Sequence, residues 1–152
     1  MPNKDEAPQK TSVGTWAKRC YMAARAAMDH ALRPYGLGST QWYVLYHLAH
    51  DGPTLQRDLQ RSLQVERATL SVVVSTLARK GLVEQLPDRV DARQKLLQMT
   101  PAGTRVWDKL PDLSQIEHIA FGGMDPADLA TTERILRAAT ERIEDHTREG
   151  IQ

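Results

Sequence analysis

Two groups of polar side chains in the middle of the chain have the types and spacing needed to bind nucleic acid. Arg67, Thr69 and Ser71 offer a cation and two hydroxyls at alternate positions. The second group supplies three cations over a short polar stretch: Arg89, Arg93 and Lys95. Cations and hydroxyls of this kind bind phosphate oxygens and base edges. A charged stretch by itself is usually a solvated loop, so the elements that position these residues decide between the two interpretations.

The second group lies on a predicted β-hairpin. Residues 82–86 and 95–99 are short β-like segments, and residues 87–94 between them are polar and charged. Two short strands around such a loop form a hairpin. Because the loop is longer than a tight turn, we expect it to project from the body of the protein with its cations at the tip.

Three predicted helices precede the hairpin. Ser39 or Thr40 is the expected N-cap of the first, Thr54 that of the short second, and the third runs from about 66 to 80. Gly81 follows the third helix, at the position where glycine commonly ends a helix. The apolar residues that define them are Trp42, Val44, Leu45 and Leu48; Leu55, Leu59 and Leu63; and Leu70, Val73, Val74 and Leu77.

This order of elements over residues 39–100 is the layout of a winged helix-turn-helix. In such a module the third helix enters the DNA major groove, and the hairpin, or wing, reaches the neighbouring backbone or minor groove. The layout places Arg67, Thr69 and Ser71 near the N-terminus of the recognition helix. The fold class we predict is therefore mainly α with a small β-hairpin wing, and the predicted partner is double-stranded DNA.

Further helices flank this lobe on both sides. Residues 13–38 contain an Ala-rich helix, and residues 101–152 contain helices that start at Thr100-Pro101 and at Asp125-Pro126, with Pro111 expected to kink or restart the first of them. Apolar residues seven apart in the last helix form a narrow seam suited to pairing with another helix: Leu129, Leu136 and Ile143. We expect both flanking regions to mediate dimerisation, and residues 1–12 to be a disordered arm.

Composition and charge narrow the possible functions. The 152 residues carry a net charge of +1, yet residues 57–105 have nine basic and five acidic groups while residues 106–152 have five and ten. The near-neutral total therefore hides a basic predicted DNA-binding lobe. A single cysteine excludes an intrachain disulfide and a cysteine-rich zinc site. No catalytic constellation, phosphate loop, signal peptide or membrane span is recognisable, so we expect a cytoplasmic protein that is not an enzyme and needs no cofactor.

Several motifs resemble the MarR family of bacterial transcription regulators, over about residues 13–146. The most specific is Asp-x-Arg in the wing followed by a strand and Thr-Pro-x-Gly. The residues that carry the resemblance are Gln41-Trp42-Tyr43-Val44-Leu45, Arg67-Ala68-Thr69-Leu70-Ser71, Lys80-Gly81-Leu82-Val83-Glu84, Asp91-Ala92-Arg93 and Leu97-Gln98-Met99-Thr100-Pro101-Ala102-Gly103.

The resemblance implies a homodimeric repressor on a pseudo-palindromic operator. Arg93 would insert into the minor groove and Asp91 would orient it, and the first and last helices would form the dimer interface. The chain departs from the family pattern at Val72, where the family often has Arg or Asn, at Gln85, where it often has Arg, and at Pro111, which interrupts a helix that many members keep straight. The first two changes remove possible DNA contacts.

Two helix faces could bind a small effector in the crevice that this family often has beside the DNA-binding lobe. Trp16 and Arg19 share a face of the first helix, and Tyr43 and His47 share a face of the second. A stacking ring, a cation and a hydroxyl or imidazole suit a small aromatic carboxylate, for which Arg is the natural bidentate partner. Packing at the dimer interface beside a surface Arg is an equal alternative. Residues 36–63 also resemble regulators of nicotinate catabolism, which respond to hydroxynicotinate; a salicylate-like acid would suit the same groups.

Two other functions are possible alternatives, and a metal site is not expected. Cys20 could be a peroxide-sensing thiol, although a small buried residue of the helical stripe explains it more simply. The winged helix could be a protein–protein adaptor without a DNA function. His47 and His50 are three apart on one helix, but no third ligand is evident, so we expect no metal site.

Overall fold

A computed structural model of the chain describes residues 12–150. They fall into two compact units, and the boundary in the sequence lies between Leu113 and Ser114. The predicted arm over residues 1–12 lies outside the described residues except for Ser12. Ser12 is the N-cap of the first helix, α1 (Val13–Leu32), and its Oγ accepts a hydrogen bond from the Thr15 backbone N–H at 3.1 Å. A short 3₁₀ turn, η1 (Arg33–Tyr35), and Gly36 in the left-handed region then end this helix.

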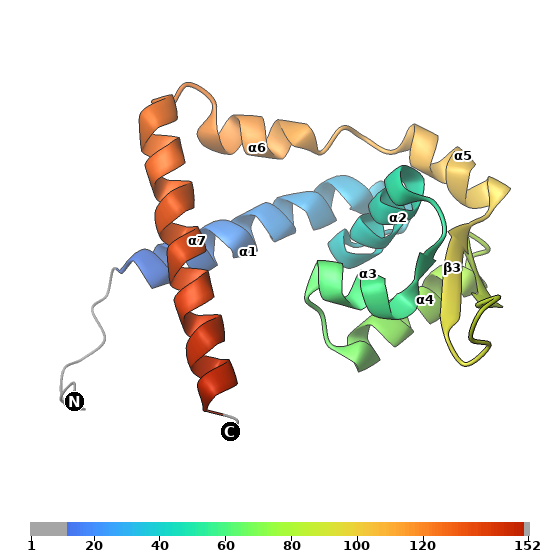
Figure 1. Ribbon diagram of the computed structural model, residues 1–152. Helices are drawn as coiled ribbons and strands as arrows, with labels where there is room; N and C mark the ends of the chain where they lie inside the picture. Colours follow the sequence, from blue (N-terminus) through green and yellow to red (C-terminus); the bar gives the residue numbers. More distant parts are fainter. Residues whose placement is uncertain (1–11, 151–152) are drawn as a thin grey trace. The chain divides into compact units, whose positions relative to one another are not determined.

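Three helices and three strands come next in the first unit, before its last helix (Figure 1). The helices are α2 (Ser39–Asp51), α3 (Gln56–Leu63) and α4 (Arg67–Arg79), as the apolar spacing predicts, and Gly81 adopts the expected positive φ of 73°. The N-caps of α2 and α3 differ from the predicted ones. Gly38 precedes α2 and Leu55 precedes α3, so Ser39, Thr40 and Thr54 are not N-caps.

A side chain from α1 replaces the predicted cap of α2. The Asp29 Oδ1 atom accepts a hydrogen bond from the Ser39 backbone N–H at 2.7 Å, and the Gln41 Oε1 atom accepts one from Gly38 N–H. These bonds satisfy N–H groups that the first turn of a helix leaves unpaired. The bond from Asp29 also ties α1 to the start of α2, which the local sequence pattern cannot reveal.

The wing is part of a three-stranded antiparallel sheet rather than an isolated hairpin. Strands β2 (Val83–Pro87) and β3 (Lys95–Met99) form the predicted hairpin, and β1 (Thr54–Leu55) pairs with the other edge of β3. The order is β1-β3-β2. A two-residue strand is too short to show a period in sequence. Its effect is to join the start of α3 to the base of the wing.

One apolar core fixes α4 within this unit. Leu70, Val74 and Leu77 of α4 are almost fully buried, and they belong to a cluster formed with the end of α1, with α2 and α3, and with the sheet. Burying each such side chain contributes about 1.5–3 kcal/mol. The rest of the fully buried members are Leu32, Val44, Leu45, Leu59 and Leu97.

The Thr-Pro-x-Gly motif closes the wing onto the next helix, α5 (Pro101–Lys109). Thr100 is its N-cap: the Oγ1 atom accepts from Gly103 N–H at 3.0 Å and donates to the Gly81 carbonyl at 2.5 Å. A Cβ on Gly103 would lie 2.1 Å from the Leu82 carbonyl oxygen, so only glycine fits there. The motif thus fastens the end of β3 to the segment that follows α4.

The second unit contains two helices, α6 (Ser114–Phe121) and α7 (Pro126–Glu149). Pro111 separates helices rather than kinking one, because α5 ends at Lys109. Asp125 caps α7 as predicted, with its Oδ1 atom accepting from Ala127 N–H. Among the described residues, no helix combines the length and apolar character required to span a membrane.

Candidate nucleic-acid interface and pocket

The exposed face of α4 carries the predicted polar residues. Its buried side chains occupy one face, and Arg67, Thr69 and Val72 are exposed. Arg67 forms no ion pair with any described residue, whereas Asp58 on α3 pairs with Arg57, with Nε and Oδ1 3.6 Å apart. The side chains of Arg67 and Thr69 are therefore not engaged within the described part of the chain.

Ser71 belongs to a chain of side-chain hydrogen bonds that joins three elements. The Gln85 Nε2 atom on β2 donates to Gln56 Oε1 at the start of α3 at 2.8 Å, and Gln56 Nε2 donates to Ser71 Oγ on α4 at 3.4 Å. Gln85, where the family often has Arg, thus bonds within the protein. This chain of bonds holds the recognition helix and the wing in register.

The wing loop presents Arg93 on a fixed support. The Arg93 side chain is 92% exposed, and its Nε donates to Asp91 Oδ1 at 3.2 Å. The Arg93 backbone N–H donates to the same oxygen at 3.1 Å. These two bonds, from the side chain first and the backbone second, hold the pKa of the Asp91 carboxyl below its ordinary value of 3.8. Asp91 remains ionised at neutral pH and orients a cation that points into solvent.

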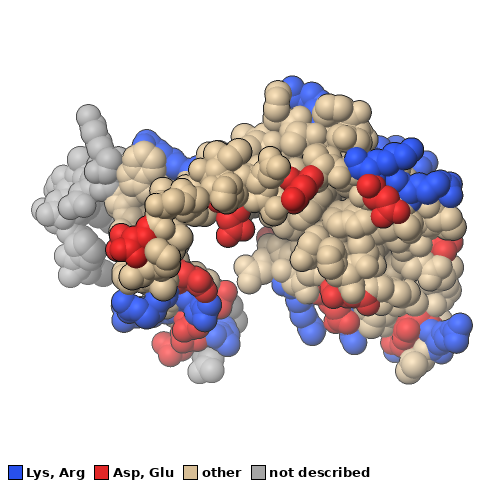
Figure 2. Space-filling view, turned by 90° about the horizontal axis from the view of Figure 1, so that it is seen from above, with Lys and Arg blue, Asp and Glu red and all other residues tan. Residues whose placement is uncertain are grey.

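The other predicted wing cations are also accessible. Arg89 and Lys95 are exposed, and neither forms an ion pair with the described residues. Residues of both signs are interspersed on the face shown in Figure 2, where the described Lys and Arg side chains gather in small clusters and form no continuous basic surface.

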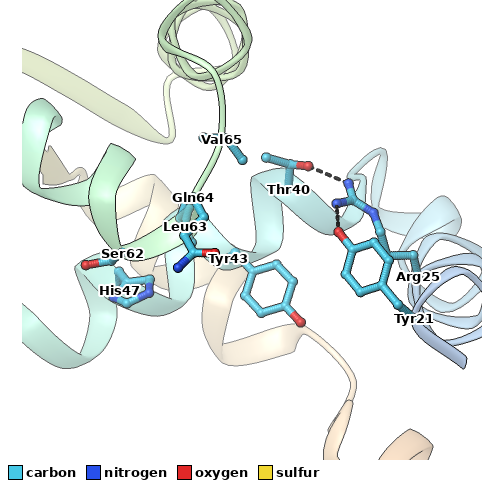
Figure 3. A pocket seen from close by; sticks show the side chains of 9 residues that line it. All are labelled: Tyr21, Arg25, Thr40, Tyr43, His47, Ser62, Leu63, Gln64 and Val65. Carbon is cyan, nitrogen blue, oxygen red and sulfur yellow. Dashed lines mark hydrogen bonds between the residues drawn. The ribbon is translucent and has the colours of Figure 1, made fainter. Parts of the chain in front are cut away.

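A separate pocket of about 280 Å³ lies in the first unit, among α1, α2 and the turn from α3 to α4 (Figure 3). This volume is near the lower end for small-molecule sites, which start at about 300 Å³. The lining has one permanent cation, no carboxylate and several hydroxyls. The lining residues are Tyr21, Arg25, Thr40, Tyr43, His47, Ser62, Leu63, Gln64 and Val65.

Arg25 is the cation of this pocket. It is half-buried, and its guanidinium donates to the Tyr21 hydroxyl at 2.8 Å and to the Thr40 hydroxyl at 2.7 Å. Both partners are neutral, and Arg25 makes no ion pair with a described residue. A partly desolvated guanidinium without a carboxylate partner is a site at which an anion gains a charge-assisted, bidentate hydrogen bond.

Two of the four predicted effector residues line this pocket. In Figure 3, Tyr43 lies between the Arg25 side and the side that holds His47 and Ser62. The His47 Nδ1 atom is 3.1 Å from Asp51 Oδ2. Trp16 and Arg19 are not among the lining residues: the Arg19 guanidinium lies 5.2 Å from the Trp16 ring centroid, farther towards the N-terminus of α1.

The sequence pattern does not single out Tyr21 and Arg25, although their spacing carries a usable signal. They are four apart on α1, so they share a face one to two turns beyond Trp16 and Arg19. Choosing between the two faces requires the contact between α1 and α2. Residues 62–65, at the end of α3 and in the turn after it, cannot be predicted as lining residues, because only tertiary packing brings them beside α2.

Cys20 is exposed in this chain, which corrects its interpretation as a small buried residue. Its neighbours on the exposed side of α1 are also apolar, so a partner helix could cover it. His50 is engaged by the Tyr46 carbonyl at 2.8 Å from its Nδ1 atom. Within residues 12–150, no three His, Cys, Asp or Glu side chains gather closely enough to hold a metal ion.

Comparisons with known proteins point to one family. Residues 35–94 match the family described as MarR. The chain is 26% identical over 126 residues to the HTH-type transcriptional repressor NicR of Pseudomonas putida, covering 82% of this chain and 80% of NicR. It is 36% identical over 85 residues to the transcriptional activatory protein BadR of Rhodopseudomonas palustris, covering 53% of this chain and 47% of BadR.

Solved structures agree. BpsR of Bordetella bronchiseptica, studied for regulation of its DNA binding by 6-hydroxynicotinic acid, is 26% identical and superposes with a TM-score of 0.72, covering 84% of this chain and 98% of BpsR. A mutant MarR of E. coli in complex with operator DNA shares the fold, with a TM-score of 0.74 at 21% identity, covering 84% of this chain and 92% of that one. The named relatives are regulators of transcription rather than enzymes. Over residues 35–94, which span most of the winged-helix part, the chain is similar to the MarR family of transcription regulators.

Proposed function

We propose that this protein is a homodimeric, cytoplasmic repressor that binds a pseudo-palindromic operator and is released by a small aromatic carboxylate. The observation that carries the DNA-binding part is the wing: a fully exposed Arg93 whose guanidinium and backbone are both held by Asp91. When Arg93 is fixed on the wing and α4 presents Arg67 and Thr69, the protein can contact the minor groove and the major groove at the same time. The Ser71 hydroxyl is instead held by Gln56.

DNA binding is tested with the full chain and the duplex upstream of its own gene. We expect a retarded complex in an electrophoretic assay that survives excess unrelated duplex, with affinity falling steeply as salt rises. Binding that an unrelated duplex competes equally well would contradict operator recognition, and no binding at low salt would favour a protein–protein adaptor.

The pocket supports the effector class. Arg25 offers two donors to a carboxylate, Tyr43 supplies a ring beside it, and His47 and Ser62 are polar groups toward the other side. A small aromatic acid with a ring hydroxyl, such as a hydroxynicotinate or a salicylate-like acid, matches this distribution. BpsR supports the first of these, because its DNA binding is regulated by 6-hydroxynicotinic acid.

A pocket at this place can act on DNA binding directly. Its wall includes the end of α3, at Ser62 and Leu63, and the turn at Gln64 and Val65 that leads into α4. A ligand changes the DNA affinity only as far as it binds the two forms of the regulator unequally. We infer that the aromatic acid favours a form in which this turn holds α4 away from its DNA-binding position.

The effector is tested by a thermal-shift screen and a DNA-release assay. 6-Hydroxynicotinate, nicotinate, salicylate and benzoate should be compared, with the uncharged amide of each as the matched control. We expect at least one acid to raise the melting temperature and release the duplex while its amide does neither. Equal effects of acid and amide would refute recognition of a carboxylate.

A further inference from the structure

Val72 is the large apolar residue at the centre of the exposed face of α4. It exposes 67% of its surface and lies opposite the buried Leu70, Val74 and Leu77. At about 3.6 residues per turn, Thr69, Thr76 and Arg79 lie on the same side of the helix. Nothing in the described part of the chain covers this side chain.

The polar groups around Val72 are largely engaged within the protein. The Thr76 hydroxyl donates to the Val72 carbonyl at 2.9 Å and accepts from Arg79 Nη2 at 3.2 Å. The Ser71 hydroxyl accepts from Gln56. The centre of the face therefore offers a partner two methyl groups rather than a hydrogen bond.

The surroundings of this apolar spot indicate what covers it. Arg67 and Arg79 lie at the two ends of α4, both are exposed, and the Arg93 cation lies on the wing of the same unit. Flanking cations suit a polyanion rather than an apolar protein surface. In the DNA major groove, the apolar group at a base edge is the C5-methyl of thymine.

We propose that Val72 reads the C5-methyl group of a thymine in each operator half-site. This inference rests on the proposed function, since it assumes that α4 enters the major groove. It also explains why Val72 replaces the Arg or Asn that is frequent in the family. A methyl–methyl contact takes the place of a hydrogen bond with a base.

The test replaces thymine by deoxyuracil, which removes the methyl group alone. A preferred duplex is first selected from a randomised pool with the full chain, and each symmetric pair of thymines is then replaced in turn. At one pair we expect the affinity to fall about threefold to fivefold for each thymine, the effect of one buried methyl group.

Protein variants assign that loss to Val72. When this pair is replaced, Val72→Ala should bind the thymine and deoxyuracil duplexes with equal affinity. At the other pairs, the ratio of the two affinities should stay as in the wild type. Val90→Ala is the matched control, because Val90 is 95% exposed but lies in the wing loop. It should keep the thymine-to-deoxyuracil ratio at every pair. Since both valines are exposed, both variants should fold normally, which circular dichroism checks.

The outcomes separate this inference from the proposed function. If the wild type selects no preferred duplex, DNA recognition itself fails. If it binds a preferred duplex but is insensitive to deoxyuracil at every pair, or if Val72→Ala keeps the wild-type ratio, the methyl contact is refuted while the proposed function stands.

Discussion

Arg93 combines full exposure with a fixed orientation, which is an unusual pairing for a long side chain. A free arginine loses considerable rotamer entropy when it is immobilised on DNA. The bonds from its Nε and its backbone N–H to Asp91 Oδ1 impose part of that order in the unbound protein. The predicted Asp-x-Arg device is thus present as a local structure, and its use on DNA is what remains to be measured.

Replacing Arg93 by Ala should weaken operator binding by about 1–3 kcal/mol per half-site and lower the slope of log affinity against log salt by about one per half-site. Fluorescence anisotropy at several salt concentrations measures both. Arg148→Ala removes an exposed arginine of α7 that is paired with Asp145 and is the control. If both variants retain the wild-type affinity and slope, Arg93 does not contact DNA.

The same variant should change the titration of Asp91. Because the pKa of Asp91 is lowered in the folded protein, its ion pair with Arg93 is complete above the ordinary value of 3.8 and is lost as the pH falls through the lowered pKa. Operator binding near neutral pH should therefore not depend on this group. In Arg93→Ala, carbon-detected NMR should show the Asp91 pKa rising back toward 3.8; an unchanged pKa would contradict this cause.

Arg25 and Arg19 provide a matched pair for the effector site, since both lie on α1 and only Arg25 lines the pocket. Arg25→Ala should abolish the release of DNA by the aromatic acid while sparing operator binding in its absence, because the carboxylate loses its bidentate partner. Arg19→Ala should respond normally in the same titration. A reversed result would place the effector near Trp16 and refute the pocket.

At the scale of elements, sequence patterns predict the helices and strands that are long enough for their apolar residues to show a period. The helices α1, α2, α3 and α4 and the two strands of the wing lie within about two residues of their predicted bounds. The predicted helix starts at Pro101 and Pro126 are also confirmed, and each proline follows an N-cap residue. These features depend on local interactions, which a single sequence records.

What sequence patterns do not predict depends on contacts between distant segments. Asp29 caps α2 from another helix, and β1 exists only because β3 lies beside it. The same distinction applies to the candidate site residues. Local motifs predict Arg67 and Arg93, whereas Arg25 lines the pocket because α1 packs on α2, which the sequence does not show. The predicted Trp16 and Arg19 lie nearer the N-terminus of α1 than the pocket-lining Tyr21 and Arg25.

Gly103 is the position where element packing is tightest. Gly103→Ala should destabilise the protein by about 1–3 kcal/mol, since the new Cβ would lie 2.1 Å from the Leu82 carbonyl oxygen and 2.7 Å from Met99 Cγ. Urea unfolding measures the loss. Gly14→Ala is the control, because its Cβ would meet nothing closer than Ser12 Oγ at 3.9 Å; it should be neutral or slightly stabilising. Equal stabilities would refute the close approach.

At the scale of the whole molecule, the helices at both ends of the chain carry several uncovered apolar residues. Trp16, Tyr21 and Met22 of α1 are exposed, and so are Ile135 and Ile143 of α7. A dimer that covers such residues would also present two winged helices to one duplex, which explains how a chain of net charge +1 could bind DNA tightly. A basic excess lies in residues 57–105, with nine basic and five acidic groups, and the acidic excess lies in residues 106–152.

Ile143→Glu should convert the protein to a monomer and lower its operator affinity more than tenfold, because a carboxylate would be buried in the predicted seam and the second half-site would be lost. Ile143 is 66% exposed, so the chain should still fold. Thr131→Glu places the same charge on the opposite face of α7 as the control. Sedimentation velocity measures the mass, and a dimeric Ile143→Glu variant would exclude this seam.

The turn that joins α3 to α4 has a consequence for anyone who adapts this regulator as a biosensor. Residues 62–65 form one wall of the pocket and connect directly to α4, with Gln64 in the left-handed region at φ 51°. Under the proposed function, substitutions in this wall would alter ligand preference and basal repression together. Libraries aimed at a new inducer should instead vary the opposite wall, at Tyr21, Thr40 and Tyr43, where a change of ligand need not disturb the unliganded output.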